Sequence, residues 1–73
     1  MNEKTKPEII RSVADGDKMV LNRPEYSKEE LHKEYMWFQA RASEINKKDG
    51  WTHYRISKVP ELNQIVIIAN VNQ

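Results

Sequence analysis

The sequence contains no cysteine and only two glycines among its 73 residues. Without cysteine, no disulfide can staple a small domain, and no thiolate is available as a nucleophile or metal ligand. Two glycines are too few to build the glycine-rich loops that bind phosphates or dinucleotides. No apolar run approaches the roughly 18 residues that cross a membrane, and no charged-then-apolar leader opens the chain. We therefore expect a cytoplasmic protein that makes no contact with a membrane.

The sequence also lacks an excess of charge of either sign. Twelve basic and eleven acidic residues leave a formal net charge of +1, which provides no long-range attraction to nucleic acid or anionic lipid. Only 38% of the residues are hydrophobic, so a domain of this size needs most of its large apolar side chains for the core. Residues 1–6 are polar and aperiodic, and we expect a mobile tail there. Residues 7–73 then form a single small domain.

The segment from Ser27 to Gly50 carries the clearest structural signal. Ser27 and Glu30 have the spacing of a capping box, in which each side chain accepts a hydrogen bond from the backbone N–H of the other residue. Gly50 stands just beyond two lysines, where a left-handed residue and nearby cations favour the end of a helix. At 3.6 residues per turn, one narrow apolar stripe forms from Leu31, Tyr35, Phe38, Ala42 and Ile45. The pattern predicts a helix from about residue 28 to residue 48.

Beyond this helix the apolar period changes from 3.6 to 2. Residues 51–59 alternate, with Tyr54 and Ile56 on one side, as is typical of a half-buried strand. A turn at residues 60–63 precedes the run 64–71, which is apolar on both faces like a central strand. The whole pattern predicts an α+β domain, with one long helix packed on a three- or four-stranded, mainly antiparallel sheet.

The segment before the long helix has two interpretations. Apolar runs at residues 9–13 and 19–21 flank Asp15 and Gly16, and an Asp-Gly pair between apolar runs is typical of a β-hairpin. Alternatively, Pro7 begins a short helix that ends before Gly16. We favour the hairpin, whose second strand has the stronger pattern.

No combination of side chains indicates catalysis. The two histidines are His32 and His53, and no cluster of histidines and carboxylates has the spacing of a metal site. Neighbouring carboxylates at Glu29 and Glu30 are explained by capping and by the helix dipole. No nucleophile elbow is present. We therefore expect a protein that is not an enzyme and that uses no cofactor and no metal.

Two groups of side chains exceed what the core requires. Met36 and Trp37 point away from the apolar stripe of the helix, and exposed tryptophan is typical of the centre of a protein interface. Trp51, His53 and Arg55 share one side of the alternating strand, and we place them on the sheet face turned away from the helix. These five residues are our candidates for binding a protein partner. In the alternative interpretation, the N-terminal segment covers the first group, and the tail or a hairpin covers the second.

Two other classes of function remain as alternatives. Basic residues near the end of the helix and in the following strand would suit phosphates, and neighbouring rings would suit stacked bases. These residues are Arg41, Lys47, Lys48, Arg55 and Lys58, with the rings of Trp51, His53 and Tyr54. Interleaved acids argue against a direct nucleic-acid site, so we expect only indirect contact. A homo-oligomeric accessory protein is the other class, although we expect a monomer.

Three features of the chain carry a resemblance to a known family. They are the length of 73 residues, the opening Met1-Asn2-Glu3-Lys4-Thr5-Lys6-Pro7-Glu8, and the long helix followed by Gly50-Trp51-Thr52 and a terminal strand. Over nearly its full length the chain resembles small phage-encoded regulators of bacterial RNA polymerase, such as the transcription inhibitor and antiterminator of a Xanthomonas phage. The resemblance implies a non-enzymatic protein that binds the N-terminal part of the polymerase β′ subunit. Such a protein would inhibit promoter recognition by the σ-containing holoenzyme and favour antitermination. The resemblance assigns no contact residues.

Overall fold

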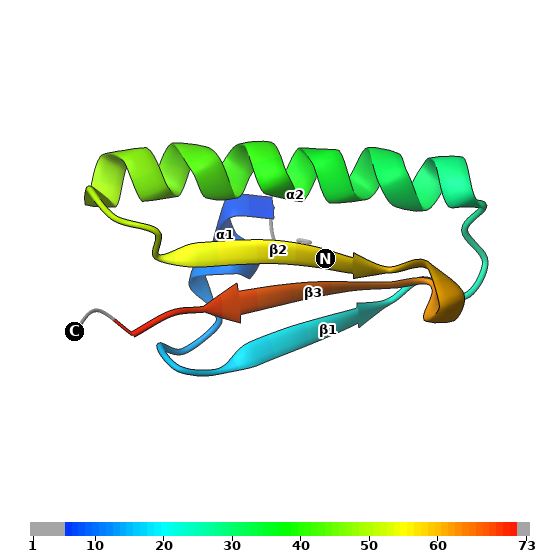
Figure 1. Cartoon of the computed structure of the whole chain (residues 1–73), viewed down its shortest axis with the longest axis horizontal. Coiled ribbons are helices and arrows are strands. Elements are labelled where there is room, and N and C mark those ends of the chain that lie inside the picture. The colour runs from blue at the N-terminus through cyan, green and yellow to red at the C-terminus, as the bar shows by residue number, and fades with distance from the viewer. Residues whose placement is uncertain (1–5, 72–73) are drawn as a thin grey trace, which may run out of the picture.

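The computed structural model describes the backbone of residues 6–71 and the side chains of residues 8–71. In chain order, the elements are α1 (Lys6–Arg11), β1 (Lys18–Asn22), α2 (Lys28–Asp49), β2 (Tyr54–Val59), a 3-10 helix (Pro60–Leu62) and β3 (Gln64–Ala69). The strands form one antiparallel sheet in the order β1-β3-β2. Figure 1 shows α2 running along one side of this sheet, with α1 on the same side. The predicted α+β class and architecture are therefore confirmed, with three strands.

The helix α2 begins and ends where the sequence indicates. The Ser27 hydroxyl accepts a hydrogen bond from the backbone N–H of Glu30 at 3.2 Å, and the Glu30 carboxylate accepts one from the N–H of Ser27 at 3.0 Å. Gly50 is left-handed, with φ of 81°, and donates its N–H to the carbonyl of Asn46. Both caps satisfy backbone groups that a helix end leaves without partners. The helix is confirmed and ends at Asp49, one residue beyond the prediction.

The sheet has two faces that differ in what covers them. Its inner face points toward α2 and consists of Met19, Leu21, Tyr54, Ile56, Lys58, Ile65, Ile67 and Ala69. Its outer face points the other way and consists of Lys18, Val20, Asn22, Arg55, Ser57, Val59, Gln64, Val66 and Ile68. Successive residues of a strand alternate between the faces. The central position predicted for the last strand is confirmed, because β3 pairs with both other strands.

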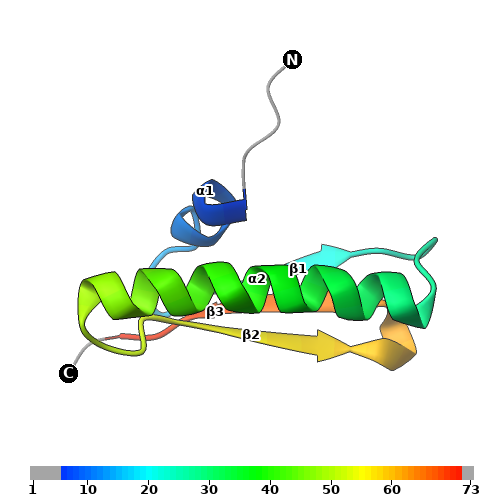
Figure 2. The same ribbon diagram turned by 90° about the horizontal axis from the view of Figure 1, so that it is seen from above.

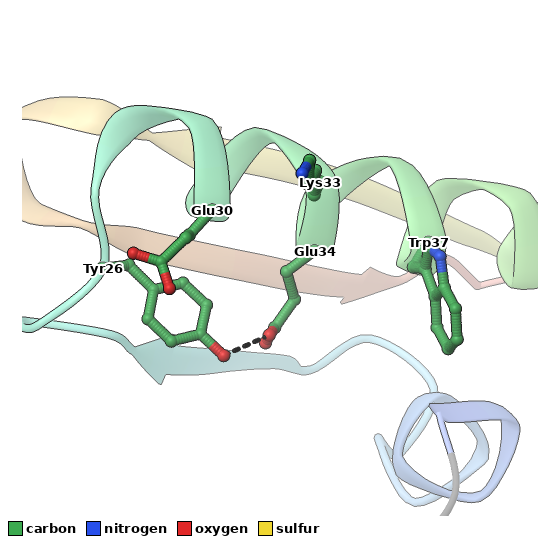
Figure 3. Close-up of a pocket in the computed structure, with 5 residues that line it drawn as sticks. All are labelled: Tyr26, Glu30, Lys33, Glu34 and Trp37. Carbon is green, nitrogen blue, oxygen red and sulfur yellow. Dashed lines mark hydrogen bonds between the residues drawn. The ribbon is translucent and has the colours of Figure 1, made fainter.

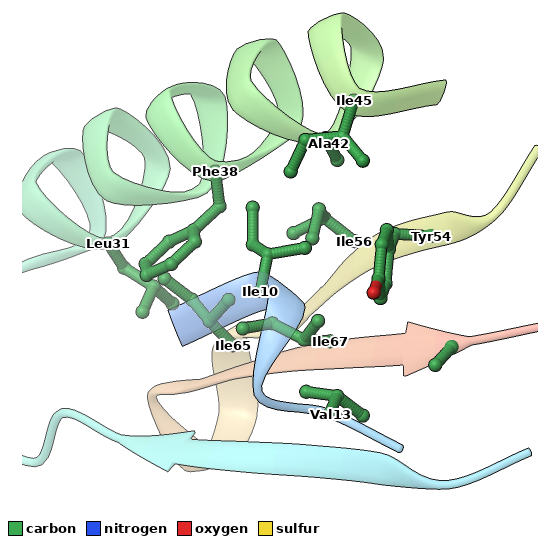
Figure 4. Packing of buried hydrophobic residues seen from close by; sticks show 11 residues of the cluster. Ile10, Val13, Leu31, Phe38, Ala42, Ile45, Tyr54, Ile56, Ile65 and Ile67 are labelled. Atoms are coloured by element: carbon green, nitrogen blue, oxygen red, sulfur yellow. The ribbon is translucent and has the colours of Figure 1, made fainter. Parts of the chain in front are cut away.

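The core fills the space between the inner face and the two helices. Its fully or nearly fully buried members are Ile10, Val13, Leu31, Phe38, Ala42, Ile45, Tyr54, Ile56, Ile65, Ile67 and Ala69. Four of the five residues in the predicted helix stripe are among them, and Tyr35 is partly buried beside them. Figure 4 shows the Phe38 ring and the Ile10 side chain entering the space between α2 and the sheet. The single helix stripe therefore faces the core as predicted.

The favoured hairpin before the long helix is wrong, and the alternative helix is correct. Lys6–Arg11 forms α1, with Pro7 in its first turn, where the missing N–H breaks no hydrogen bond. Ile10 is completely buried beneath α2, a position that a hairpin strand beside β1 would not reach. Residues 1–5 of the predicted tail lie outside the described residues, and Lys6 belongs to α1.

The Asp-Gly turn exists but connects different elements from those predicted. Gly16 has a φ of 86°, and its N–H donates to the carbonyl of Ala69 at 2.9 Å. The turn therefore leads from α1 into β1, and β1 pairs with β3. A positive φ at Gly16 suits any tight reversal, so it does not specify what precedes the turn. The second predicted turn, at residues 60–63, is confirmed as a 3-10 helix that ends at the left-handed Asn63.

Candidate functional site

The exposed side of α2 carries two large apolar side chains. Trp37 is 63% exposed and Met36 is 51% exposed, whereas Phe38, the next residue, is 1% exposed. Both lie where the sequence places them, away from the core stripe. Single exposed apolar residues are normal on a protein surface, so the surroundings of Trp37 decide whether they matter.

Trp37 lies at one end of a shallow groove of 290 Å3 along the first half of α2. The groove, called the Trp37 groove below, is lined by Tyr26, Glu30, Lys33, Glu34 and Trp37. Figure 3 shows the Tyr26 ring at the other end, with the Glu34 carboxylate reaching toward it between the two aromatic rings. The groove therefore combines aromatic walls with a charged centre. A second hollow lies near the end of α2, lined by Ser43, Glu44, Asn46, Lys47, Gly50 and Trp51.

Hydrogen bonds hold one wall of the Trp37 groove in place. Glu34 accepts a hydrogen bond from the Tyr26 hydroxyl at 2.7 Å and another from Arg23 Nε at 2.8 Å. The bond to Glu34, followed by burial, raises the pKa of Tyr26 above its ordinary value, so the hydroxyl remains a donor. The Glu34 side chain is only 14% exposed, which shields its ion pair with Arg23 from solvent. The three side chains hold one another, and the wall is preformed.

Ile9, Ile10 and Val13 do not cover Trp37. Ile10 and Val13 are buried in the main core, and Ile9 packs against its edge. Although α1 contacts α2, Trp37 stays 63% exposed. The alternative in which the N-terminal segment buries this side of α2 is therefore wrong for residues 8–71.

A polar cluster joins the end of α2 to the loop after α1. His53 Nδ1 lies 2.7 Å from Asp49 Oδ2, and His53 Nε2 lies 2.8 Å from Asp15 Oδ1. Arg11 of α1 donates to both carboxylate oxygens of Asp49, at 3.2 and 3.3 Å. We call these four residues the His53 cluster. It ties four segments together: α1, the loop that follows it, the end of α2, and the connection from α2 to β2.

The His53 imidazole is surrounded by groups that favour its charged form. Both ring nitrogens are donors only in the imidazolium, and each faces a carboxylate. The bond to Asp49, followed by that to Asp15, raises the pKa of His53. In return, His53 and then Arg11 lower the pKa of the Asp49 carboxyl. The cluster is an internal clamp in which every member is engaged by another.

The second group of candidate residues does not share one face, and that prediction is wrong. Trp51 and His53 precede β2, which starts at Tyr54. The His53 ring stacks against Trp51 with centroids 4.7 Å apart and against Tyr54 with centroids 4.0 Å apart. Arg55 alone lies on the outer face, where it is exposed. The alternation of residue types continues before the point at which pairing with β3 begins, so it overstates the length of the strand.

The basic residues of the nucleic-acid alternative are also dispersed. Lys58 lies on the inner face, where its Nζ is 2.7 Å from His32 Nδ1. Arg41 pairs with Glu44 on α2 at 3.4 Å, whereas Arg55 lies on the outer face. Lys58, Arg41 and Arg55 therefore lie on three different parts of the molecule and do not form one cationic surface.

Several residues that build these arrangements carry no functional signal in the sequence alone. The aromatic and acidic partners in the Trp37 groove are Tyr26 and Glu34, and the carboxylates of the His53 cluster are Asp15 and Asp49. Tyr26 stands directly before the helix cap, which is the one local signal among them. The other three are ordinary polar residues until the fold places a partner opposite each of them.

No family of known proteins, no curated relative and no solved structure matches this chain. Among residues 6–71, no helix combines the length and the apolarity needed to span a bilayer. In the same described part of the chain, no three histidine or carboxylate side chains gather as a metal ion would require.

Proposed function

We propose that this chain is a phage-encoded regulator that binds bacterial RNA polymerase and has no enzymatic activity of its own. Its partner is the N-terminal part of the β′ subunit, met in the cytoplasm of the host. Binding inhibits promoter recognition by the σ-containing holoenzyme and favours antitermination. The resemblance at residues 1–8 and 50–52 supports this choice of partner. The observation that supports binding as the activity is Trp37, which is 63% exposed beside a preformed groove.

The Trp37 groove has the composition and order of an interface centre. Tryptophan and tyrosine are enriched among the residues that contribute most to protein binding. The Tyr26 ring is already held by its bond to Glu34, so a partner loses less freedom in ordering this wall. Met36 extends the apolar surface beside Trp37, and its flexible side chain adapts to an irregular partner. We infer that Met36 and Trp37 contact the polymerase directly.

Binding of purified core polymerase to the immobilised protein tests the proposal. We expect Trp37→Ala to raise the Kd about 30-fold or more, since a hot-spot residue contributes about 2 kcal/mol or more. Leu62→Ala is the matched control, because Leu62 is 64% exposed and does not line the groove. It should change the Kd by less than about 3-fold. A circular dichroism spectrum of each variant establishes that it is folded.

Transcription in vitro provides the functional readout. The wild-type protein should reduce promoter-dependent initiation by the holoenzyme and increase read-through on a template with a terminator, and Trp37→Ala should weaken both effects together. If core polymerase is not retained at all, the partner is wrong. If Trp37→Ala binds as tightly as the wild type, the partner stands and the groove is not the contact surface.

A further inference from the structure

The outer face of the sheet is a second surface, separate from the Trp37 groove. Both helices lie on the inner side of the sheet, as Figures 1 and 2 show from two directions. No helix or strand formed by residues 6–71 covers the outer side. A three-stranded sheet with one solvated face is expected to be polar there. This one is not.

The register arranges the outer face in three rows that cross the strands. Lys18, Ile68 and Arg55 form the first row; Val20, Val66 and Ser57 the second; Asn22, Gln64 and Val59 the third. Val20 is 41% exposed, and Val66 and Ile68 are partly exposed beside it. In the third row the two amide side chains bond to each other, since Gln64 Nε2 donates to Asn22 Oδ1 at 2.8 Å. The result is an apolar centre between a cationic row and a neutral amide row.

The two cations of the first row have no partner among residues 8–71. Neither Lys18 nor Arg55 forms a hydrogen bond or an ion pair there, and the outer face contains no carboxylate. By contrast, Arg11, Arg23 and Arg41 each pair with an acid elsewhere. A concentrated positive potential beside apolar side chains attracts a carboxylate that stands next to an apolar group.

The dimensions of the outer face match one helix better than a second copy of the chain. Three strands place the outermost two about 10 Å apart, and six residues span about 20 Å. An α-helix is about 10 Å wide. A face of roughly 200 Å2 is far below the ~800 Å2 per partner of a standard protein interface, so any occupant of this face alone binds weakly. A two-fold stack about Val66 would set the cations against the amide row, leaving them without acids.

We propose that the outer face binds one amphipathic helix of a partner protein, whose apolar stripe is flanked by aspartate or glutamate. The stripe covers Val20, Val66 and Ile68, while the flanking carboxylates pair with Lys18 and Arg55. A single nucleic-acid strand fits less well, because the outer face offers no aromatic side chain on which bases could stack. This inference does not depend on polymerase as the partner.

A titration of the isotopically labelled full chain, followed by its amide NMR signals, tests the proposal. The probe is a synthetic 14-residue helical peptide with a leucine stripe flanked by glutamates, and its match carries lysine at each glutamate position. We expect the glutamate peptide to shift the amide signals of Lys18, Val20, Val66 and Ile68, and the lysine peptide to leave them in place.

Charge reversal on the outer face should invert this preference. In Lys18→Glu/Arg55→Glu the glutamate peptide should bind about 10-fold more weakly, and the lysine peptide should now bind. Lys28→Glu/Lys48→Glu is the matched control, with the same change in net charge at exposed positions of α2. It should preserve the preference of the wild type.

Four results would overturn the proposal. They are no shift by the glutamate peptide, equal shifts by both peptides, the same shifts produced by a 15-residue oligothymidylate, and a dimer in sedimentation that Val66→Lys converts to a monomer. The last two would assign the outer face to nucleic acid or to a second copy. Retention of polymerase by the wild type is unaffected by any of them, so the two proposals fail separately.

Discussion

The two faces of the central strand β3 carry the same kind of residue but differ in how far they are buried. Ile65 and Ile67 are completely buried on the inner face, whereas Val66 and Ile68, their neighbours in the chain, are partly exposed on the outer face. All four are β-branched and apolar, so residue type does not distinguish them. What differs is the cover, because α1 and α2 lie over one face only. An apolar side chain stabilises the fold only where another element removes it from water.

Phe38→Ala is the largest test of the inner face. Phe38 is 1% exposed at the centre of the core, and its truncation should lower the free energy of unfolding by about 3–5 kcal/mol. That is comparable to the whole stability of a small domain, so the variant should be largely unfolded. Urea denaturation followed by circular dichroism measures it. Trp37→Ala is the control, expected to cost less than about 1 kcal/mol at an exposed position. A stable Phe38→Ala protein would show that the helix stripe is not the core.

Ile67→Ala and Ile68→Ala compare the two faces within one strand. The first should cost about 2–5 kcal/mol because it leaves a cavity beneath the helices, and the second less than about 1.5 kcal/mol. Urea midpoints of both variants, measured side by side, test the difference. Equal losses would mean that the outer face is covered as fully as the inner one.

Ser27→Ala weakens the cover of the inner face rather than the face itself. The Ser27 hydroxyl caps α2, and its loss should cost about 1 kcal/mol. The exposed Ser43 lies in the middle of the same helix, so Ser43→Ala should cost nothing or add slightly to stability. Thermal unfolding of the two variants is the measurement. Identical melting temperatures would show that the Ser27 cap does not stabilise α2.

The smallest expected effect concerns the clamp between α1 and α2. The pKa of His53 is raised above 6.5, so the stability it contributes is complete below pH 6.5 and is lost as the pH rises through the folded-state pKa. The pKa of Asp49 is lowered below 3.8, so its contribution is present above that pH and is lost as the pH falls. His53→Gln should flatten the alkaline limb of a plot of stability against pH. An unchanged alkaline limb in this variant would show that His53 does not clamp the loop after α1 to the end of α2.

Asp15→Asn separates the two carboxylates of the clamp. It removes the charge opposite Nε2 while Asp49 keeps its bond to Nδ1. The pKa of His53, followed by its ring NMR signals, should fall but remain above that of an isolated histidine. A value equal to the wild type would mean that Asp15 does not face the ring in solution.

Local signals predicted the elements whose ends are set by neighbouring residues. Ser27, Glu30 and Gly50 determine the bounds of α2 through hydrogen bonds made within one turn, so a single sequence suffices to find them. The central position of β3 follows from its apolar character on both faces. The hairpin predicted for residues 7–16 was wrong because Asp15-Gly16 permits a chain reversal without specifying which element precedes it. Burial of Ile10 under α2 made that choice, and it depends on a contact with residues far along the chain.

Some features of the candidate site were likewise predictable from the sequence, and others were not. The sequence indicated that Met36 and Trp37 leave the core stripe, because the helical period depends on the chain alone. It did not indicate the groove beside Trp37, since Tyr26 and Glu34 meet only when the loop before α2 folds back along the helix. The predicted face shared by Trp51, His53 and Arg55 failed because strand pairing, rather than alternation, decides where β2 begins.

Three features could be read from the amino-acid sequence alone: the long capped helix, the central apolar strand and the side of α2 that leaves the core. These features depend on hydrogen bonds and periods that span a few residues. The tertiary structure was needed to show that the segment before β1 is a helix, that His53 bridges two carboxylates, and that residues 6–71 leave one sheet face uncovered. These depend on contacts between distant residues, such as the 38 positions between Asp15 and His53, which no local pattern records.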